Sequence, residues 1–403
     1  MAIAQPTASD TLKSPAPDRG TALVLILIFV LGEVLIASAA GARQSALFLI
    51  GGVMGVTLFH AAFGFTGGWR RFSVHRRGRA IRAQMLMIAV AALFFIPLLK
   101  IGTFAGHPLV GAFAPVGVSV LAGAAMFGFG MQLGGGCGSG TLFTVGGGSA
   151  RMLVTLAGFV AGALIGTAHL PWWLSLPSLP PVNLGASLGM AGGLAVTLAG
   201  LGLVALLTVL IERRAHGNLE RAPRPDTAGL ERLLHGPWPL IGAAIVLALA
   251  NVATLLTAGH TWSITFGFGL WGAKIAEAVG VPVSNWAFWQ WPGPATALSA
   301  SVLDDTVSVM NFGILVGAAV AASLAGKFAP KASLPLLSLT AAILGGLLMG
   351  YGARLSFGCN IGALFSGIAS GSLHGWLWFA AAFGGSLAGI AIRPLFGLDG
   401  FRK

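Results

Sequence analysis

The chain has 403 residues, of which 56% are hydrophobic and only 8% are charged, and its mean hydropathy is +0.88. This composition excludes an ordinary soluble protein and predicts one that lies in a lipid bilayer. The formal net charge of +12 would suggest nucleic acid as the partner of a soluble protein. Here the basic residues gather between apolar stretches, and enrichment of Lys and Arg in cytoplasmic loops explains that pattern better, so we expect no nucleic-acid partner.

Apolar stretches long enough to cross about 30 Å of hydrocarbon recur along the whole chain. The sequence therefore predicts an all-α fold, a polytopic membrane helical bundle in contact with the lipid bilayer. The predicted spans cover residues 21–40, 44–66, 83–101, 110–132, 151–169, 187–211, 238–258, 310–326, 334–352 and 374–392.

The N-terminal region offers two interpretations. Its first apolar stretch ends in IASAAGA, which resembles a signal-peptidase site. The leader is long, however, and Glu33 interrupts the apolar run. We therefore favour a cytoplasmic tail over residues 1–20 and a retained extra transmembrane helix over residues 21–43, with cleavage as the alternative.

Two basic segments, at residues 69–82 and 211–236, organise the rest of the chain. Their positive charge predicts that both are cytoplasmic. The second segment divides the protein into a first transmembrane half (44–211), a basic cytoplasmic linker (212–236) and a second transmembrane half (237–403). This topology places the N- and C-termini in the cytoplasm.

The only two cysteines occupy equivalent positions in a repeated segment. A shift of 222 positions lays MFGFGMQLGGGCGSGTLF (126–143) on LMGYGARLSFGCNIGALF (348–365) and aligns Cys137 with Cys359. Such a coincidence favours a functional pair over two inert buried thiols. The eight coinciding pairs are Gly128 and Gly350, Gly130 and Gly352, Leu133 and Leu355, Gly136 and Gly358, Cys137 and Cys359, Gly140 and Gly362, Leu142 and Leu364, and Phe143 and Phe365.

The predicted topology gives the two cysteine segments opposite orientations. The span before Cys137 runs inward, whereas the span before Cys359 runs outward, which is the pattern of inverted repeats. We predict that residues 134–148 and 356–372 form two glycine-rich re-entrant loops carrying the cysteines. The alternative is that these glycines only allow close helix packing. Residues 259–280 are apolar, and we predict a re-entrant or interfacial segment there.

Four blocks of sequence resemble the YeeE/YedE family, also called the sulfur-transport family. The blocks are GFGMQLGGGCGSGTLFTVGGGS (128–149), AGHTWSITFGFGLWGAK (258–274), NFGILVGAAVAA (311–322) and RLSFGCNIGALFSGIASGSLHGWLWF (354–379). The resemblance implies a transporter of the bacterial inner membrane that imports thiosulfate, with Cys137 and Cys359 handing the anion along. It also implies a small cytoplasmic TusA-like sulfur carrier as a partner. Relatives can carry a further periplasmic cysteine that this chain lacks, and others are linked to selenium.

Thiosulfate is a dianion with a soft terminal sulfur, and a neutral thiol offers it one weak donor of matching softness. Burial favours the protonated thiols, so we expect hydrogen-bond transfer rather than nucleophilic attack. Glycine backbone N–H groups and helix N-termini can face the anion without blocking it. The predicted substrate path comprises Cys137, Cys359, Gly136, Gly138, Ser139, Gly358, Asn360 and Arg354.

Several other polar residues have both a structural and a functional interpretation. Arg354 can attract the anion at the outer mouth or extend to the membrane surface. Ser139 and Thr141 can donate hydroxyl groups or bond back to their own helix. Lys274 and Glu277, three residues apart, are predicted to pair with each other.

The main alternative functions are transport of a selenium compound or another sulfur compound, and a membrane-embedded sulfurtransferase that uses a cysteine persulfide. The second needs a reactive thiolate in an electropositive site, and the sequence offers no Cys-His pairing of evident geometry. We therefore predict a transporter rather than an enzyme. No nucleotide-binding loop or metal-ligand motif is evident, so no cofactor is expected.

Overall fold

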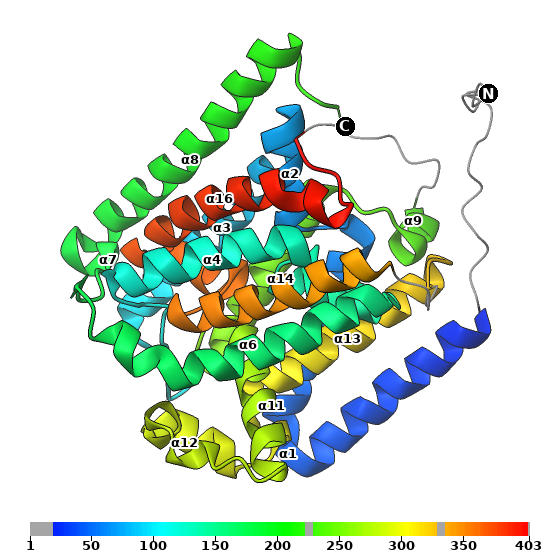
Figure 1. Cartoon of the computed structure of the whole chain (residues 1–403), viewed down its shortest axis with the longest axis vertical. Coiled ribbons are helices and arrows are strands. Elements are labelled where there is room, and N and C mark those ends of the chain that lie inside the picture. Colours follow the sequence, from blue (N-terminus) through cyan, green and yellow to red (C-terminus); the bar gives the residue numbers. More distant parts are fainter. Residues whose placement is uncertain (1–18, 222–228, 329–334, 402–403) are drawn as a thin grey trace.

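The computed structural model describes residues 19–221, 229–328 and 335–401. Most of the predicted N-terminal tail and residues 222–228 of the predicted linker lie outside the described residues. Within the described residues, nine helices are long and apolar enough to cross a membrane. The prediction of a polytopic helical membrane bundle is thus confirmed (Figure 1). The division into two transmembrane halves stays a prediction.

The elements follow one another in a mostly helical order. The first are α1 (Arg19–Ala61), α2 (Phe65–His75), α3 (Arg79–Ile101), α4 (Val118–Gly134), α5 (Gly138–Gly146), α6 (Ala150–Leu174), α7 (Leu184–Ser187) and α8 (Gly189–His216). Next come α9 (Gly229–His235), α10 (Leu240–Ala258), α11 (Thr265–Ala278), α12 (Pro292–Ser299), α13 (Thr306–Leu324), α14 (Leu336–Leu355), α15 (Gly367–Ala369) and α16 (Leu373–Ile392). The short turns are η1 (Val283–Asn285), η2 (Ala287–Gln290), η3 (Val302–Asp304), the π-helix η4 (Asn360–Ser366) and η5 (Arg393–Phe396).

Four two-residue strands form small antiparallel pairs outside the long helices. β1 (Thr103–Phe104) pairs with β2 (His107–Pro108). β3 (Val116–Gly117) pairs with β4 (Ser178–Leu179), which ties the start of α4 to the end of α6.

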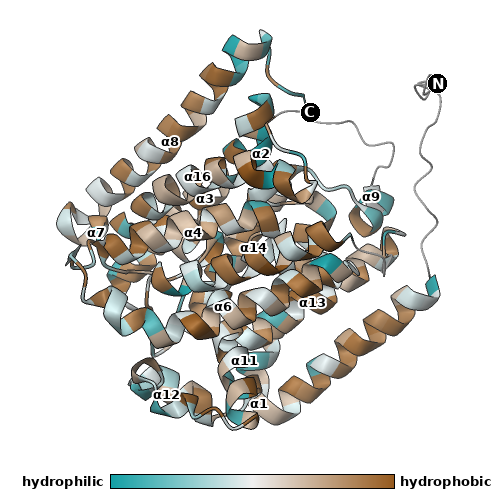
Figure 2. Ribbon diagram, in the orientation of Figure 1, coloured by the Kyte–Doolittle hydropathy of each residue, from teal (hydrophilic) through white to brown (hydrophobic). Residues whose placement is uncertain are grey.

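The first two predicted spans run together in α1. At about 1.5 Å per residue, its 43 residues would measure about 65 Å, roughly twice the hydrocarbon thickness. Gly41 interrupts the helix with φ 83° and ψ 176°, a conformation that glycine adopts without steric cost. The two arms therefore diverge, and the first one stands away from the bundle (Figure 1). Its apolar surface is exposed, as expected of a lipid-facing helix (Figure 2).

The repeated helices α4 and α14 lie side by side and run in opposite directions. Near the start of α4, the Ser119 hydroxyl donates to the Leu355 carbonyl at the end of α14, over 2.6 Å. Near the other end, Arg151 at the start of α6 donates to the Ser338 hydroxyl at the start of α14, over 2.8 Å. This antiparallel arrangement is the one that inverted repeats require.

Glycines let the backbones of these helices approach closely. A Cβ on Gly130 would lie 2.8 Å from the Gly345 carbonyl oxygen, too close for a side chain. Gly128 faces the main chain of α16 at Ala382, and its repeat mate Gly350 faces the main chain of α6 at Phe159. Close helix packing is thus one role of these glycines, as the alternative interpretation proposed.

The two basic segments gather on one face of the protein, which we call the basic face. There Glu212 of α8 is fully buried and accepts hydrogen bonds from Arg82 (2.8 Å), Arg77 (3.3 Å) and the Gly78 backbone N–H (3.1 Å). Glu220 adds its own backbone N–H at 2.7 Å. One buried carboxylate therefore connects α8 to the loop between α2 and α3. Hydrophilic residues accordingly collect at the ends of α2 and α8 (Figure 2).

Residues 259–280, for which we predict a re-entrant or interfacial segment, contain α11. Its 14 residues are fewer than a full crossing needs. Its depth in the membrane stays a prediction. The predicted Lys274–Glu277 pair is wrong. Lys274 instead donates to the carbonyls of Leu298 (2.7 Å) and Ala300 (2.6 Å), and Glu277 accepts from the Ser284 backbone N–H. Each charge finds main-chain partners at the ends of neighbouring elements.

Replacement of Glu212 by Gln is expected to lower the free energy of unfolding in detergent by about 3 kcal/mol, because it leaves the partly buried donors Arg77 and Arg82 without their anion. Arg71→Gln is the matched control, since the Arg71–Glu220 pair is exposed at Arg71 (56%), and its loss should cost about 1 kcal/mol or less. Equal losses in the two variants would contradict a special role for Glu212.

Candidate functional site

The two cysteines occupy the same local structure in different parts of the chain. Cys137 is the N-cap of α5, and its sulfur accepts from the Gly140 backbone N–H at 3.4 Å. Cys359 is the N-cap of η4, and its sulfur accepts from the Ile361 backbone N–H at 3.4 Å. Both thiols are free and buried, with exposures of 1% and 0%.

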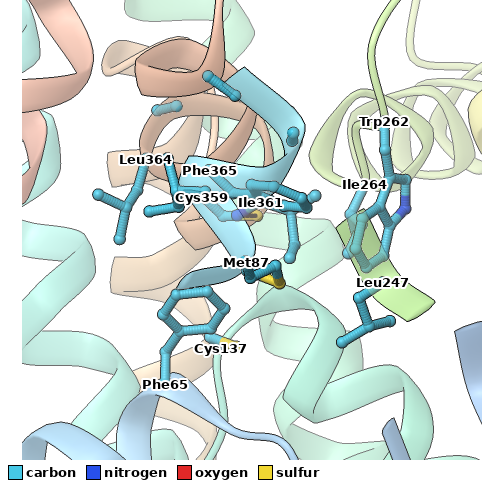
Figure 3. Packing of buried hydrophobic residues seen from close by; sticks show 14 of the residues in the cluster. Phe65, Met87, Cys137, Leu247, Trp262, Ile264, Cys359, Ile361, Leu364 and Phe365 are labelled. Atoms are coloured by element: carbon cyan, nitrogen blue, oxygen red, sulfur yellow. Dashed lines mark hydrogen bonds between the residues drawn. The ribbon is translucent and has the colours of Figure 1, made fainter. Parts of the chain in front are cut away.

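The two cysteine segments meet inside the bundle. A Cβ built on Gly138, next to Cys137, would lie only 3.0 Å from the Cys359 sulfur. Figure 3 shows both cysteines in the same group of buried residues. Positions separated by 222 residues thus form one site, as the repeat predicted.

A glycine in an unusual backbone conformation precedes each thiol. Gly135, at φ 93°, ends α4, and Gly358, at φ 152°, lies between α14 and Cys359. Residues with a side chain rarely adopt these conformations. Because α5 and η4 then begin at the cysteines, the positive ends of both helices point to the place where the thiols lie. This arrangement favours an anion.

Several buried polar groups at the site have no partner. Both side-chain atoms of Asn360 and the Thr141 hydroxyl are buried without a hydrogen bond among the described residues. Ser139 is fully buried, and its hydroxyl lies 3.5 Å from the Cys137 sulfur. Among the described residues, neither hydroxyl bonds back to its own helix, and their role in binding the anion stays a prediction. Unpaired buried groups of this kind are costly unless a ligand or water binds them.

The loop before α11 lines the site together with the two cysteine segments. The sequence analysis did not assign this loop to the site. Ile264 lies 3.5 Å from a Cβ built on Gly138, and its carbonyl accepts from Asn311 of α13 at 3.0 Å. The hydroxyl of Ser263 is the nearest atom to a Cβ on Gly362, at 3.6 Å. Only the resemblance of residues 258–274 to a family block signalled this segment.

Arg354 lies at the end of α14 among aromatic rings. Its guanidinium is 4.6 Å from the centre of the Phe288 ring and 5.7 Å from that of Phe266. Its Nε atom is buried without a hydrogen bond, and none of the ion pairs among the described residues includes it. The side chain is partly exposed and packs against these rings, and no carboxylate of the described residues pairs with it.

The described residues contain no group of three or more His, Cys, Asp or Glu side chains that could hold a metal ion. The site therefore consists of two thiols, hydroxyl and amide groups, and main-chain N–H groups. Such a set can donate hydrogen bonds to an anion.

This fold and this site define a multi-pass helical membrane protein with a thiol pair at its centre. The chain belongs to the "Sulphur transport" family, whose family model matches residues 60–388. This confirms the family that the four sequence blocks resemble.

Individual relatives are named as transporters. The chain is 30% identical to "Probable transporter YedE" of Escherichia coli (strain K12) over 161 residues, which is 40% of this chain and 39% of that protein. It is 25% identical to "Thiosulfate transporter TsuA" of Spirochaeta thermophila over 337 residues, or 82% of this chain and 92% of that protein. The TsuA of Escherichia coli is also 25% identical over 82% of this chain and 88% of its own length.

Gly138→Ala is expected to slow the reaction of Cys359 with a small uncharged thiol reagent several-fold, because the added methyl group lies against the sulfur. Mass spectrometry of the labelled peptide measures the rate. Gly362→Ala is the matched control, since its Cβ makes an ordinary contact at 3.6 Å. An unchanged rate in Gly138→Ala would argue against the close approach of the two segments.

Proposed function

We propose that this protein imports thiosulfate across the bacterial inner membrane and that Cys137 and Cys359 pass the anion between them by hydrogen bonds. The observation that carries the proposal is the meeting of the two buried thiols between the helices α5 and η4. The family and the names of the TsuA relatives support a sulfur-containing anion as the substrate.

The chemistry of the site suits a soft dianion in transit. Thiol S–H groups and main-chain N–H groups donate weak hydrogen bonds, and no lysine or arginine lies directly between the cysteines to hold the anion tightly. Weak sites in sequence allow an ion both to enter and to leave. Gly136, Gly138 and Gly358 keep side chains out of the path, and the free amide of Asn360 gives the anion a further donor.

In this proposal, Arg354 is the first residue that attracts the incoming anion. It lies five residues before Cys359, at the end of α14 that is far from Ser338 and the basic face. Because aromatic rings rather than a carboxylate surround it, its charge remains available to an incoming dianion. The anion then passes from Arg354 to Cys359 and on to Cys137.

The basic face lies in the cytoplasm in this proposal, together with both chain termini. The clustering of the basic segments around Glu212 supports this orientation, since loops rich in Lys and Arg stay inside. A TusA-like sulfur carrier would receive the anion or its sulfur on the same face.

Cys137→Ala and Cys359→Ala are each expected to reduce thiosulfate uptake into liposomes at least about tenfold, because each removes a donor worth about 1.4 kcal/mol. Radiolabelled thiosulfate measures uptake, with sulfate and selenite as competitors. The corresponding Cys→Ser variants keep a donor of similar size and should retain more activity. Unchanged uptake in both alanine variants would remove the thiols from the mechanism.

Arg354→Gln is expected to raise the thiosulfate concentration for half-maximal uptake several-fold with little change in the maximal rate, because it removes the attraction of an anion that has yet to reach the thiols. Arg354→Lys keeps the charge and is the matched control. The concentration dependence of uptake measures the effect. A lower maximal rate at an unchanged half-maximal concentration would contradict this role.

A further inference from the structure

A cavity of about 450 Å³ opens on the basic face, between the start of α2 and the start of α10. Three arginines line it, and the described residues that line it include no carboxylate. Arg71 also pairs with Glu220 at 2.6 Å, whereas Arg79 and Arg232 form no ion pair among the described residues. The rest of the lining is apolar or glycine apart from the neutral Gln84, so the charge of the cavity wall is positive.

The N-terminus of α2 opens into the same cavity. Gly64 is the N-cap of α2, and no side chain caps it. Gly64 and Gly67 line the cavity, and a Cβ on either would meet no atom within 4 Å. The nearby Thr66 hydroxyl is buried without a hydrogen bond. An uncapped helix start with adjacent arginines is a favourable setting for a small oxyanion.

Phe65 belongs to the same buried group as the two thiols (Figure 3). In the chain, this fully buried residue lies between Gly64 and Gly67, which line the cavity. Gln132 at the end of α4 donates to the Thr66 carbonyl at 3.2 Å, which holds the start of α2 against the segment that leads to Cys137.

We propose that the cavity lined by Arg71, Arg79 and Arg232 binds a small divalent oxyanion after it leaves Cys137, and that the Phe65 ring closes the connection between them. This inference rests on the proposed transport function and assigns its inner site. The phosphate of an anionic lipid headgroup shares this chemistry, so the experiment must separate the two sources.

The test measures modification of Cys137 by two methanethiosulfonate reagents of similar size, one anionic and one cationic. The protein is purified in nanodiscs of zwitterionic lipid. Phe65→Ala is expected to speed modification of Cys137 by the anionic reagent at least tenfold and to leave Cys359 at its wild-type rate. Phe48→Ala, at a buried phenylalanine of a separate apolar cluster in α1, is the control and should have little effect. Phe65→Leu keeps a bulky side chain and should stay close to the wild type, which shows that the position tolerates substitution.

The arginines are tested in the Phe65→Ala background. Arg79→Gln with Arg232→Gln should abolish the preference for the anionic reagent, and millimolar thiosulfate or sulfate should slow modification only when the arginines are present. Equal rates in Phe65→Ala and the wild type would overturn the role of Phe65. If Cys137 is protected from modification only when the nanodisc contains phosphatidylglycerol, the cavity binds a lipid headgroup and not the transported anion. That result would overturn the proposed inner site.

These outcomes differ from a failure of the proposed function. If liposome uptake of thiosulfate is absent in the wild type while the labelling pattern and anion protection hold, the substrate assignment is wrong and the inner anion site stands. If uptake depends on the cysteines but the labelling pattern is absent, the inner site is wrong and the transport function stands.

Discussion

The close approach of helix backbones is the constraint on which the rest of this structure depends. Two long helices, α4 and α14, carry glycines where they face each other and their neighbours α6 and α16. Main chain packs directly against main chain there, and only glycine permits it. This packing sets where each helix ends: α4 at its C-cap Gly135 and α14 at its C-cap Ser356, each shortly before a cysteine. The position of the thiol pair is therefore a consequence of helix packing.

The thiol site is polar within surroundings that are almost wholly apolar. Its donors are arranged by two short helices that begin at the cysteines, while buried groups such as Asn360 have no partner among the described residues. A site of this kind is ready to bind and has no strong charge of its own. Strong charges lie around it: Arg151 donates to the Leu133 and Gly134 carbonyls before Cys137. Further charges lie at Arg354 and on the basic face.

The sequence predicted the helical bundle and the pairing of Cys137 with Cys359, because apolar length and an internal repeat are both visible in one dimension. It could not predict contacts that depend on the fold. Lys274 binds the carbonyls of Leu298 and Ala300, which become neighbours only when α12 packs beside α11, so the expected pair with Glu277 does not form. Likewise, Asn311 of α13 binds the carbonyl of Ile264, a contact between two family blocks that the sequence alone does not reveal. The sequence showed a gap between the first two predicted spans near Gly41. It did not show that the two spans are arms of the single kinked helix α1.

The aromatic surroundings of Arg354 have a consequence for the conditions in which the protein works. A guanidinium balanced by Asp or Glu would gain net positive charge in acid and lose it near neutral pH, when the carboxylate ionises. Arg354 lies against ring faces, which do not titrate, and arginine itself stays protonated at all physiological pH values. The positive charge of Arg354 therefore does not depend on the ionisation of a paired carboxylate among the described residues.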